Sequence, residues 1–180
     1  MISLRSKVSQ QILNYFMLQQ GSEVYVNDLA RILHTESGNL TRKLIVLEKE
    51  GLLKSRWQGK QRYYSLNKSF PLFKEYKNIV SKTIGLEQIL KTSLGTISGI
   101  KKAVIFGSYA QEKMDSHSDI DFLVVGDHST VELQKAVAQV QKSTQRDINA
   151  VSMSLQEYND KKGKDPFLKS VESKKTVRII

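Results

Sequence analysis

Residues 107–125 read GSYAQEKMDSHSDIDFLVV and contain the side chains that bind metal ions and phosphate groups in proteins. Asp119 and Asp121 stand one position apart ahead of an apolar run, so on a β-strand both carboxylates point to one face. Two carboxylates this close repel each other unless a cation neutralises both. Paired hard oxygen ligands suit Mg²⁺, which keeps water and substrate phosphate in its remaining positions. The spacing therefore predicts a divalent-cation site, with Mg²⁺ as the expected ion and Mn²⁺ as the alternative.

Gly107 and Ser108 form the other half of this predicted site. A glycine lets the chain turn tightly and lets a phosphate approach the backbone. A short helix beginning at Ser108 would direct free N–H groups and the positive end of its dipole at an anion. With a metal ion on one side and phosphate on the other, we expect the site to bind a nucleoside triphosphate through its Mg²⁺.

The segments around these residues alternate between strands and a helix. Apolar, β-rich runs predict strands at residues 101–106, 119–126 and 146–153, and TVELQKAVAQVQKS predicts a helix between the last two. Alternating strands and helices indicate an α/β domain over residues 96–180. The final TVRII resembles one more strand.

The spacing of Gly-Ser, ten intervening residues and Asp-x-Asp resembles the signature of the DNA polymerase β-like nucleotidyltransferase superfamily, and more narrowly the minimal nucleotidyltransferases with the motif GS…SDIDFLV. The resemblance covers about residues 100–155. It implies that Gly107 and Ser108 bind the nucleotide and that Asp119, Asp121 and a third carboxylate, Asp147 in RDINAV, ligate the metal ions and carry the catalysis. The implied reaction moves a nucleoside monophosphate from the triphosphate to a hydroxyl, phosphate, protein or small-molecule acceptor.

One position departs from that family pattern. The family usually has Arg-Gly or a similar pair after the alanine of GSxA, whereas this chain has Gln111-Glu112. The change removes a cationic phosphate contact and adds negative charge near the expected triphosphate. Lys113 is a candidate substitute for the missing cation.

The first seventy residues predict a separate small domain. Periodic apolar residues predict helices over residues 3–19, from a cap at Asn27 to Leu33, and from Ser37 or Asn39 to Gly51, with a short strand at residues 24–26. In the third helix Leu40, Leu44, Leu47 and also Val46 are candidates for the buried face. Two β-type runs around Gln58-Gly59-Lys60 then predict a hairpin with a cation at its tip.

Three helices followed by a basic hairpin is the order of a winged helix-turn-helix, and the segments LTRKLIVLEKEGLL and SRWQGKQRYYSLN resemble the ArsR- and MarR-like regulators. That resemblance places the third helix in the major groove of double-stranded DNA and the hairpin on phosphate or the minor groove. The implied DNA contacts are Ser37, Asn39, Thr41, Arg42, Lys43, Arg56, Lys60 and Arg62. A protein-interaction or dimerisation module with a solvated basic face is the alternative interpretation.

Residues 69–95 carry a long apolar stripe that predicts a connecting helix, entered at Pro71 and bent at Gly85. The stripe is too apolar to remain in water. It packs either against the same helix of a second subunit, which would give a homodimer, or against a domain of its own chain.

Composition supports a protein that binds polyanions. The chain of 180 residues has a net charge of +10, and residues 1–68 hold eleven Lys and Arg against five Asp and Glu. A generally basic, soluble surface is the bland alternative. There is no cysteine, no signal-peptide pattern and no apolar run long enough to span a bilayer, so we expect a cytoplasmic protein without a membrane partner.

The sequence thus predicts an α/β (α+β) protein of two domains. Residues 1–68 form a winged helix-turn-helix, residues 69–95 a connecting helix, and residues 96–180 a nucleotidyltransferase-like mixed sheet with flanking helices. The leading hypothesis is a nucleotidyltransferase fused to a DNA reader that regulates transcription. The alternative is a regulator without catalysis, whose second domain only senses a nucleotide or another ligand.

Overall fold

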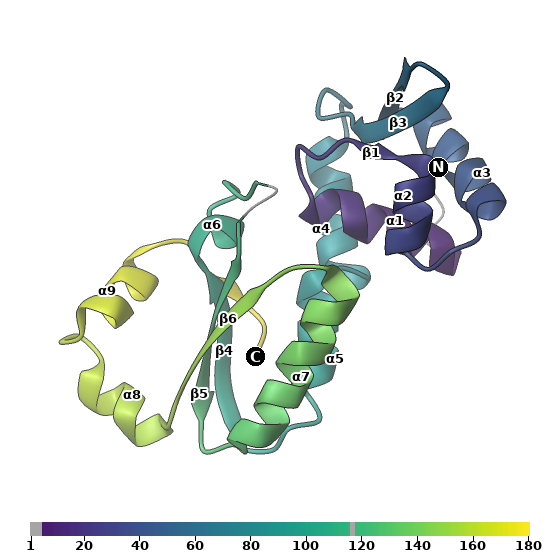
Figure 1. Cartoon of the computed structure of the whole chain (residues 1–180). Helices are drawn as coiled ribbons and strands as arrows, with labels where there is room; N and C mark the ends of the chain where they lie inside the picture. The colour runs from purple at the N-terminus through teal and green to yellow at the C-terminus, as the bar shows by residue number, and fades with distance from the viewer. Residues whose placement is uncertain (1–4, 116–117) are drawn as a thin grey trace. The chain divides into compact units, whose positions relative to one another are not determined.

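The computed structural model describes residues 5–115 and 118–180, and the chain divides into two compact units (Figure 1). The first unit ends at Gly85 and the second begins at Leu86. In the described ranges, no helix is both long and apolar enough to cross a lipid bilayer.

The first unit contains a small antiparallel sheet (Figure 1). In the sequence, helices come before the first strand, between the first and second strands, and after the third. The strands lie in the order β1-β3-β2. The bounds are α1 Lys7–Leu18, β1 Val24–Tyr25, α2 Val26–Ile32, α3 Ser37–Lys49, β2 Leu53–Gln58, β3 Gln61–Leu66 and α4 Phe73–Thr83. Helix, helix, helix and hairpin follow in the order of a winged helix-turn-helix, so this part of the predicted fold is confirmed.

The core of the first unit follows from the helical spacing of its leucines. Leu40 and Leu44 of α3 are 0% exposed and pack with Leu29 of α2 and Phe16 of α1. Val46 was also a candidate for this buried face, but its exposed fraction is 49%, so that part of the prediction is wrong. A residue two places after Leu44 lies about 200° around the helix, which turns it to the solvent.

Two predicted helix starts differ from the structure. Helix α2 begins one residue before Asn27, and its capping position is Tyr25, which makes no side-chain cap. Helix α3 does begin at Ser37, but the cap is Glu36, whose carboxylate accepts hydrogen bonds from the N–H groups of Gly38 and Asn39 at 2.6 and 2.7 Å. A carboxylate satisfies two of the free N–H groups at a helix start and complements its positive dipole end.

The second unit is a mixed sheet in the order β6-β5-β4-β7 with helices on both faces (Figure 1). Strands β5 and β6 run parallel, and β4 pairs antiparallel with both β5 and β7. The bounds are α5 Leu86–Leu94, β4 Ile100–Phe106, α6 Gly107–Ala110, β5 Ile120–Gly126, α7 Thr130–Thr144, β6 Ile148–Met153, α8 Leu155–Lys161, α9 Pro166–Ser173 and β7 Val177–Arg178. This is the predicted α/β arrangement, and the fold class is confirmed.

Strand β5 is buried on both faces, as expected for a central strand. Leu123 and Val125 face the core that Tyr158 of α8 and Leu168 of α9 complete. The alternate residues Phe122 and Val124, both 0% exposed, point to the other face. Helices α5 and α7 lie on the side of the sheet opposite α8 and α9 (Figure 1). Both faces of β5 are covered from Phe122 onward. Its charged side chain, Asp121, therefore lies near the start of the strand.

The predicted connecting helix is two helices, one in each unit. Helix α4 packs against α1, and α5 packs against α7. The break lies at Gly85, where a Cβ atom would come within 2.7 Å of the Cα of Ser81. Much of the apolar stripe is therefore used within the chain, with Val80, Leu86, Leu90 and Leu94 at most 1% exposed.

Candidate functional site

The three predicted catalytic aspartates lie at the start of the two parallel strands. Residues Ile120 and Ile148 are register partners and both are buried. Asp119 precedes the first and Asp147 the second, and neighbouring residues in register point to the same face of a sheet. Asp121 is paired with Asn149, and the same register continued by one residue would put Asp147 next to Asp119, on the face that Asp121 shares.

The strand starts that carry Asp119, Asp121 and Asp147 are called the acidic end below. Gly107 lies directly against its Asp121 carboxylate. Its φ is +69°, and an added Cβ atom would stand 2.1 Å from the carboxylate oxygen Oδ2 of Asp121. Glycine is thus required here for two reasons, the left-handed backbone and the space that the carboxylate occupies. The Gly-Ser turn and the Asp-x-Asp pair, separated by ten residues in sequence, meet at this point.

Asn149 is a polar residue of this site that the sequence analysis did not single out. It is the register partner of Asp121, and its amide nitrogen donates a hydrogen bond to Oδ2 of Asp119 at 3.2 Å. It follows Asp147 by two residues on the same strand face, and this alternation was the signal that would have identified it.

The donor set fits a metal ion that arrives with its substrate. Among the described residues, no three acidic or histidine side chains are close enough together to hold an ion by themselves. Mg²⁺ is normally held by one or two carboxylates together with substrate phosphate and water. The Asp119–Asp121 pair supplies that number of carboxylates, and neither they nor Asp147 form an ion pair with a described residue.

Helix α6 carries Ser108 and is anchored to α5. The hydroxyl of Tyr109 donates to Oε1 of Glu87 at 3.5 Å, and burial, with the nearby Glu87 charge, raises the pKa of Tyr109. The turn after α6 is closed by the N–H of Lys113, which donates to the carbonyl of Ser108 at 3.0 Å. The phosphate-binding half of the predicted site is therefore a short, well-braced turn.

Glu112, the residue that departs from the family pattern, is paired with a cation. Its carboxylate accepts a hydrogen bond from Nζ of Lys175 at 2.5 Å, and its φ of +59° is left-handed. Lys175 comes from the segment just before β7. The negative charge of Glu112, expected beside the triphosphate, is therefore paired with Lys175, which lies 63 residues later in the sequence.

The predicted DNA contacts of α3 differ in exposure. Ser37 and Arg42 are exposed, whereas Asn39, Thr41 and Lys43 are half-buried. Val46, exposed and one turn beyond Arg42, adds an apolar side chain to that surface. Hydrogen bonds from the backbone of Asn39 and Gly38 lower the pKa of Glu36 at the start of the helix.

The three predicted contacts of the wing differ from one another. Lys60 is exposed at the hairpin tip. Arg56 is held by Glu23 through two hydrogen bonds of 2.7 and 2.6 Å, and this partner raises the pKa of Arg56. Lys60 is thus presented to a ligand, while Arg56 already has an anionic partner.

Arg62 braces the wing against α3. Its guanidinium donates to Oε2 of Glu48 at 2.6 Å and to the hydroxyl of Ser55 at 3.0 Å. It also lies over the rings of Trp57 and Tyr64, 5.5 and 5.1 Å from their centres. With its side chain 27% exposed and engaged on several sides, Arg62 is placed as a structural link between β3 and α3.

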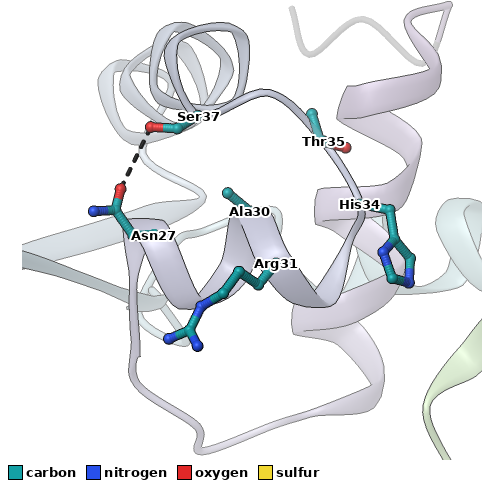
Figure 2. A pocket seen from close by; sticks show the side chains of 6 residues that line it. All are labelled: Asn27, Ala30, Arg31, His34, Thr35 and Ser37. Atoms are coloured by element: carbon teal, nitrogen blue, oxygen red, sulfur yellow. Dashed lines mark hydrogen bonds between the residues drawn. The ribbon is translucent and has the colours of Figure 1, made fainter.

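A hollow of about 440 Å³ lies beside the start of α3 (Figure 2). Figure 2 shows side chains from α2 and from the turn that follows it around the opening, with the Ser37 hydroxyl donating to Oδ1 of Asn27 at 3.4 Å. The lining residues are Asn27, Ala30, Arg31, His34, Thr35 and Ser37. Of these, only Ser37 was a predicted DNA contact.

Comparison with solved structures gives distant likenesses to two kinds of protein. HlyU from Vibrio cholerae is 22% identical with a TM-score of 0.34, covering 42% of this chain and 72% of its own. MepR, a transcription regulator from Staphylococcus aureus, is 21% identical with a TM-score of 0.37, covering 49% and 65%. The toxin-antitoxin pair MntA-HpeT matches at 14% identity and a TM-score of 0.40, covering 53% and 73%. At such scores these likenesses carry no conclusion about this chain.

Comparison with protein families gives a direct result. No curated protein matches the chain. The model of the nucleotidyltransferase domain matches residues 86–179, which is more than half of the 180 residues and nearly all of the second unit. Because this match includes the Gly-Ser turn and the aspartates whose positions are described above, the chain belongs to the nucleotidyltransferase domain family, joined here to a winged helix-turn-helix unit.

Proposed function

We propose that the second unit transfers a nucleoside monophosphate from a nucleoside triphosphate to an acceptor, with Mg²⁺ or Mn²⁺ as the cofactor. The observation that supports this most is the parallel register of β5 and β6, whose continuation would bring Asp147 to the face of Asp119 and Asp121, together with Gly107 packed against Asp121. Carboxylates placed together without an internal cation cost folding free energy, and a bound divalent ion would offset that cost.

In this proposal each residue has a defined part. Asp119 and Asp121 would hold the metal ions, and Asp147 would ligate the ion on the acceptor side and help to deprotonate the attacking hydroxyl. Ser108 and the backbone at Gly107 bind the outer phosphates. The acceptor oxygen attacks the α-phosphorus in line, the bond to the β-phosphate oxygen breaks, and pyrophosphate leaves. The bound ion would neutralise the charge that develops on the phosphates.

A transfer assay tests this part of the proposal. The protein is incubated with α-labelled ATP, GTP, CTP or UTP and Mg²⁺ or Mn²⁺, together with candidate protein, small-molecule and nucleic-acid acceptors. Pyrophosphate release and label transfer are expected, and Asp119→Asn and Asp121→Asn should reduce both by more than about 100-fold, since even outer partners of a metal site account for about 10–100-fold. Asp160→Asn, at an exposed site on α8, is the matched control.

Two outcomes would contradict catalysis. Equal turnover in wild type and both variants would show that the aspartates do not hold the reacting metal ion. Nucleotide binding without turnover across the acceptor screen would favour the alternative, a second unit that only senses a ligand.

For the first unit we propose binding to double-stranded DNA, with regulation of transcription as its role. Helix α3 would enter the major groove through Ser37, Asn39, Thr41, Arg42 and Lys43, and Lys60 would reach the backbone from the wing. Asn27, Arg31 and Thr35 line the same hollow as Ser37 and would extend that surface (Figure 2). Arg56 would contact DNA only by exchanging Glu23 for phosphate, and Arg62 would act through the position of the wing.

Binding measured against salt concentration tests the DNA proposal. Fluorescence anisotropy with duplexes selected from a random library should show affinity that falls steeply with salt, because phosphate-bound cations are released on association. Arg42→Ala should weaken binding by about 1–3 kcal/mol and relax preference at one position, whereas Lys60→Ala should lower the salt slope by about 1. Affinity unchanged in both variants would favour a protein-interaction module.

The homodimer predicted from the apolar stripe is a separate proposal. Two apolar side chains remain exposed here, Leu72 at the capping position just before α4 at 52% and Ile79 within α4 at 45%. Sedimentation equilibrium of the wild type and of Leu72→Ser with Ile79→Ser should show a dimer that the double variant loses. A wild-type monomer at every concentration would reject it.

A further inference from the structure

Arg146 is a charged residue that is only 6% exposed. It is adjacent in sequence to Asp147 and lies just before β6. Arginine is seldom buried to this degree unless its charge and its N–H groups have partners. The partners of Arg146 therefore indicate what the buried guanidinium does.

The guanidinium binds the main chain that leads into Asp119. Its NH1 group donates to the carbonyl of Ser118 at 3.0 Å, and its NH2 group donates to the carbonyl of Asp115 at 2.7 Å. The planar fork of an arginine can reach two acceptors at once, which a lysine ammonium on a flexible stem does with less geometric control. Arg146 thus fixes the two described positions that flank residues 116–117.

The same two positions are tied to each other. The hydroxyl of Ser118 accepts the N–H of Asp115 at 3.1 Å and donates to Oδ1 of Asp115 at 2.8 Å. Two residues after Ser118, the N–H of Ile120 donates to the carbonyl of Asp147 at 2.9 Å. Arg146 and Asp147 together therefore hold the segment of Asp119 from both sides, through a side chain and through the ladder between the strands.

We propose that Arg146 is a positioning residue that holds Asp119 in register with Asp147 so that the acidic end can bind a divalent ion. This inference rests on the proposed function and deepens it. Arg146 does not contact substrate in this assignment, because its side chain is buried and its fork is turned to the carbonyls of Asp115 and Ser118. Its effect on the metal ion passes through the main chain on either side of Asp119.

Direct measurement of Mn²⁺ binding tests the inference without relying on turnover. Binding is followed by electron paramagnetic resonance with MnCl₂ and α,β-methylene nucleotide analogues, for wild type, Arg146→Met and Arg146→Lys. We expect Mn²⁺ affinity to fall by about 10–100-fold in Arg146→Met, as for outer partners of other metal sites, and by less in Arg146→Lys. Lys142→Met, an exposed site on α7, removes the same charge and should leave affinity unchanged.

A second measurement reports on the brace itself. Hydrogen exchange at the Ile120 amide, measured by NMR without metal, should be faster in Arg146→Met and partly restored in Arg146→Lys, with Lys142→Met equal to wild type. If Arg146→Met does not fold, the Arg146→Lys protein decides the matter through the same two measurements.

The outcomes separate this inference from the function on which it rests. Wild-type protein that binds no Mn²⁺ would overturn the proposed function and this inference together. Mn²⁺ bound by wild type and equally by the Arg146 variants would overturn the inference alone, and so would unchanged exchange at Ile120. The inference is supported if Arg146→Met lowers the Mn²⁺ affinity and speeds hydrogen exchange at the Ile120 amide, and if both effects are smaller in Arg146→Lys.

Discussion

The wing of the first unit and the acidic end of the second treat their charges in opposite ways. In the wing, Arg56 is paired with Glu23 and Arg62 with Glu48. At the acidic end, within residues 5–115 and 118–180, no ion pair reaches Asp119, Asp121 or Asp147. Both regions are built from charged residues near strand ends, yet only one balances them within the chain.

The difference separates charges that serve the fold from charges that serve a ligand. A cation that already has a partner inside the protein gains little from an external anion, because it must first give up that partner. Carboxylates gathered without a cation are unfavourable for the fold and are found where binding or catalysis requires them. On this basis Arg56 and Arg62 are weaker candidates for ligand contact than Lys60, and the aspartates are stronger ones.

The largest expected effect comes from removing one of the unpaired carboxylates. Asp121→Asn should abolish the rise in melting temperature that Mn²⁺ with nucleotide gives the wild type, and should lower turnover by more than about 100-fold. In EDTA the variant should melt at or above the wild-type temperature, because one repelling charge is gone. Differential scanning fluorimetry with and without metal measures this, and a variant that is clearly less stable in EDTA would contradict the comparison.

Arg62→Met tests the paired region and should have the next largest effect. Hydrogen bonds to charged groups contribute about 1.5–3 kcal/mol each, and Arg62 makes such a bond to half-buried Glu48. We expect the free energy of unfolding of the first unit to fall by roughly that amount in urea titrations. Lys60→Met, at the exposed hairpin tip, is the control and should leave stability unchanged while weakening DNA binding. Equal stability of the two variants would remove Arg62 from its structural role.

Gly107→Ala should have an intermediate effect that reaches both fold and site. A left-handed backbone costs a side chain about 1–2 kcal/mol, and here the new methyl group also meets the Asp121 carboxylate. We expect a lower melting temperature together with weaker Mn²⁺ binding. Gly163→Ala is a matched control, since Gly163 also has a positive φ but no atom stands within 4 Å of an added Cβ. Similar Mn²⁺ affinity in both variants would show that the contact with Asp121 is unimportant.

The smallest effect is expected at Glu36, the exposed cap of α3. Its pKa is lowered in the folded protein, so its stabilisation is present above the ordinary value of 4.5 and is lost as the pH falls through the lower folded value. Helical structure at the start of α3, followed by NMR, should therefore fray as the solution is acidified below pH 4.5. Glu36→Gln should remove the pH dependence in that range. A start of α3 that titrates identically in the variant would assign the effect to another group.

Some of this molecule was predictable because it depends on spacing along one strand. The alternation of apolar and polar residues predicted the strand that carries Asp121, and the helix between two apolar runs predicted its parallel neighbour β6. The helical spacing of Leu40, Leu44 and Leu47 likewise predicted the core of the first unit.

Other features depend on segments that are distant in sequence. Glu23 and Arg56 are 33 residues apart, and nothing in either segment announces the partner. Arginine is usually exposed, so the sequence alone would place Arg146 on the surface. Its burial follows only from the packing of the segment before β5 against the entry to β6. Glu36 was overlooked because Ser37 is the more usual capping residue, although a carboxylate reaches two N–H groups.

The break at Gly85 has an evolutionary consequence. Each unit contributes its own helix up to that glycine, so the seam falls between two hydrophobic cores and cuts through neither of them. Recombination of coding sequences at this codon would exchange one half for another module without rebuilding the remaining half. Ancestry can therefore be traced separately for residues before and after the seam, and we expect the two histories to differ.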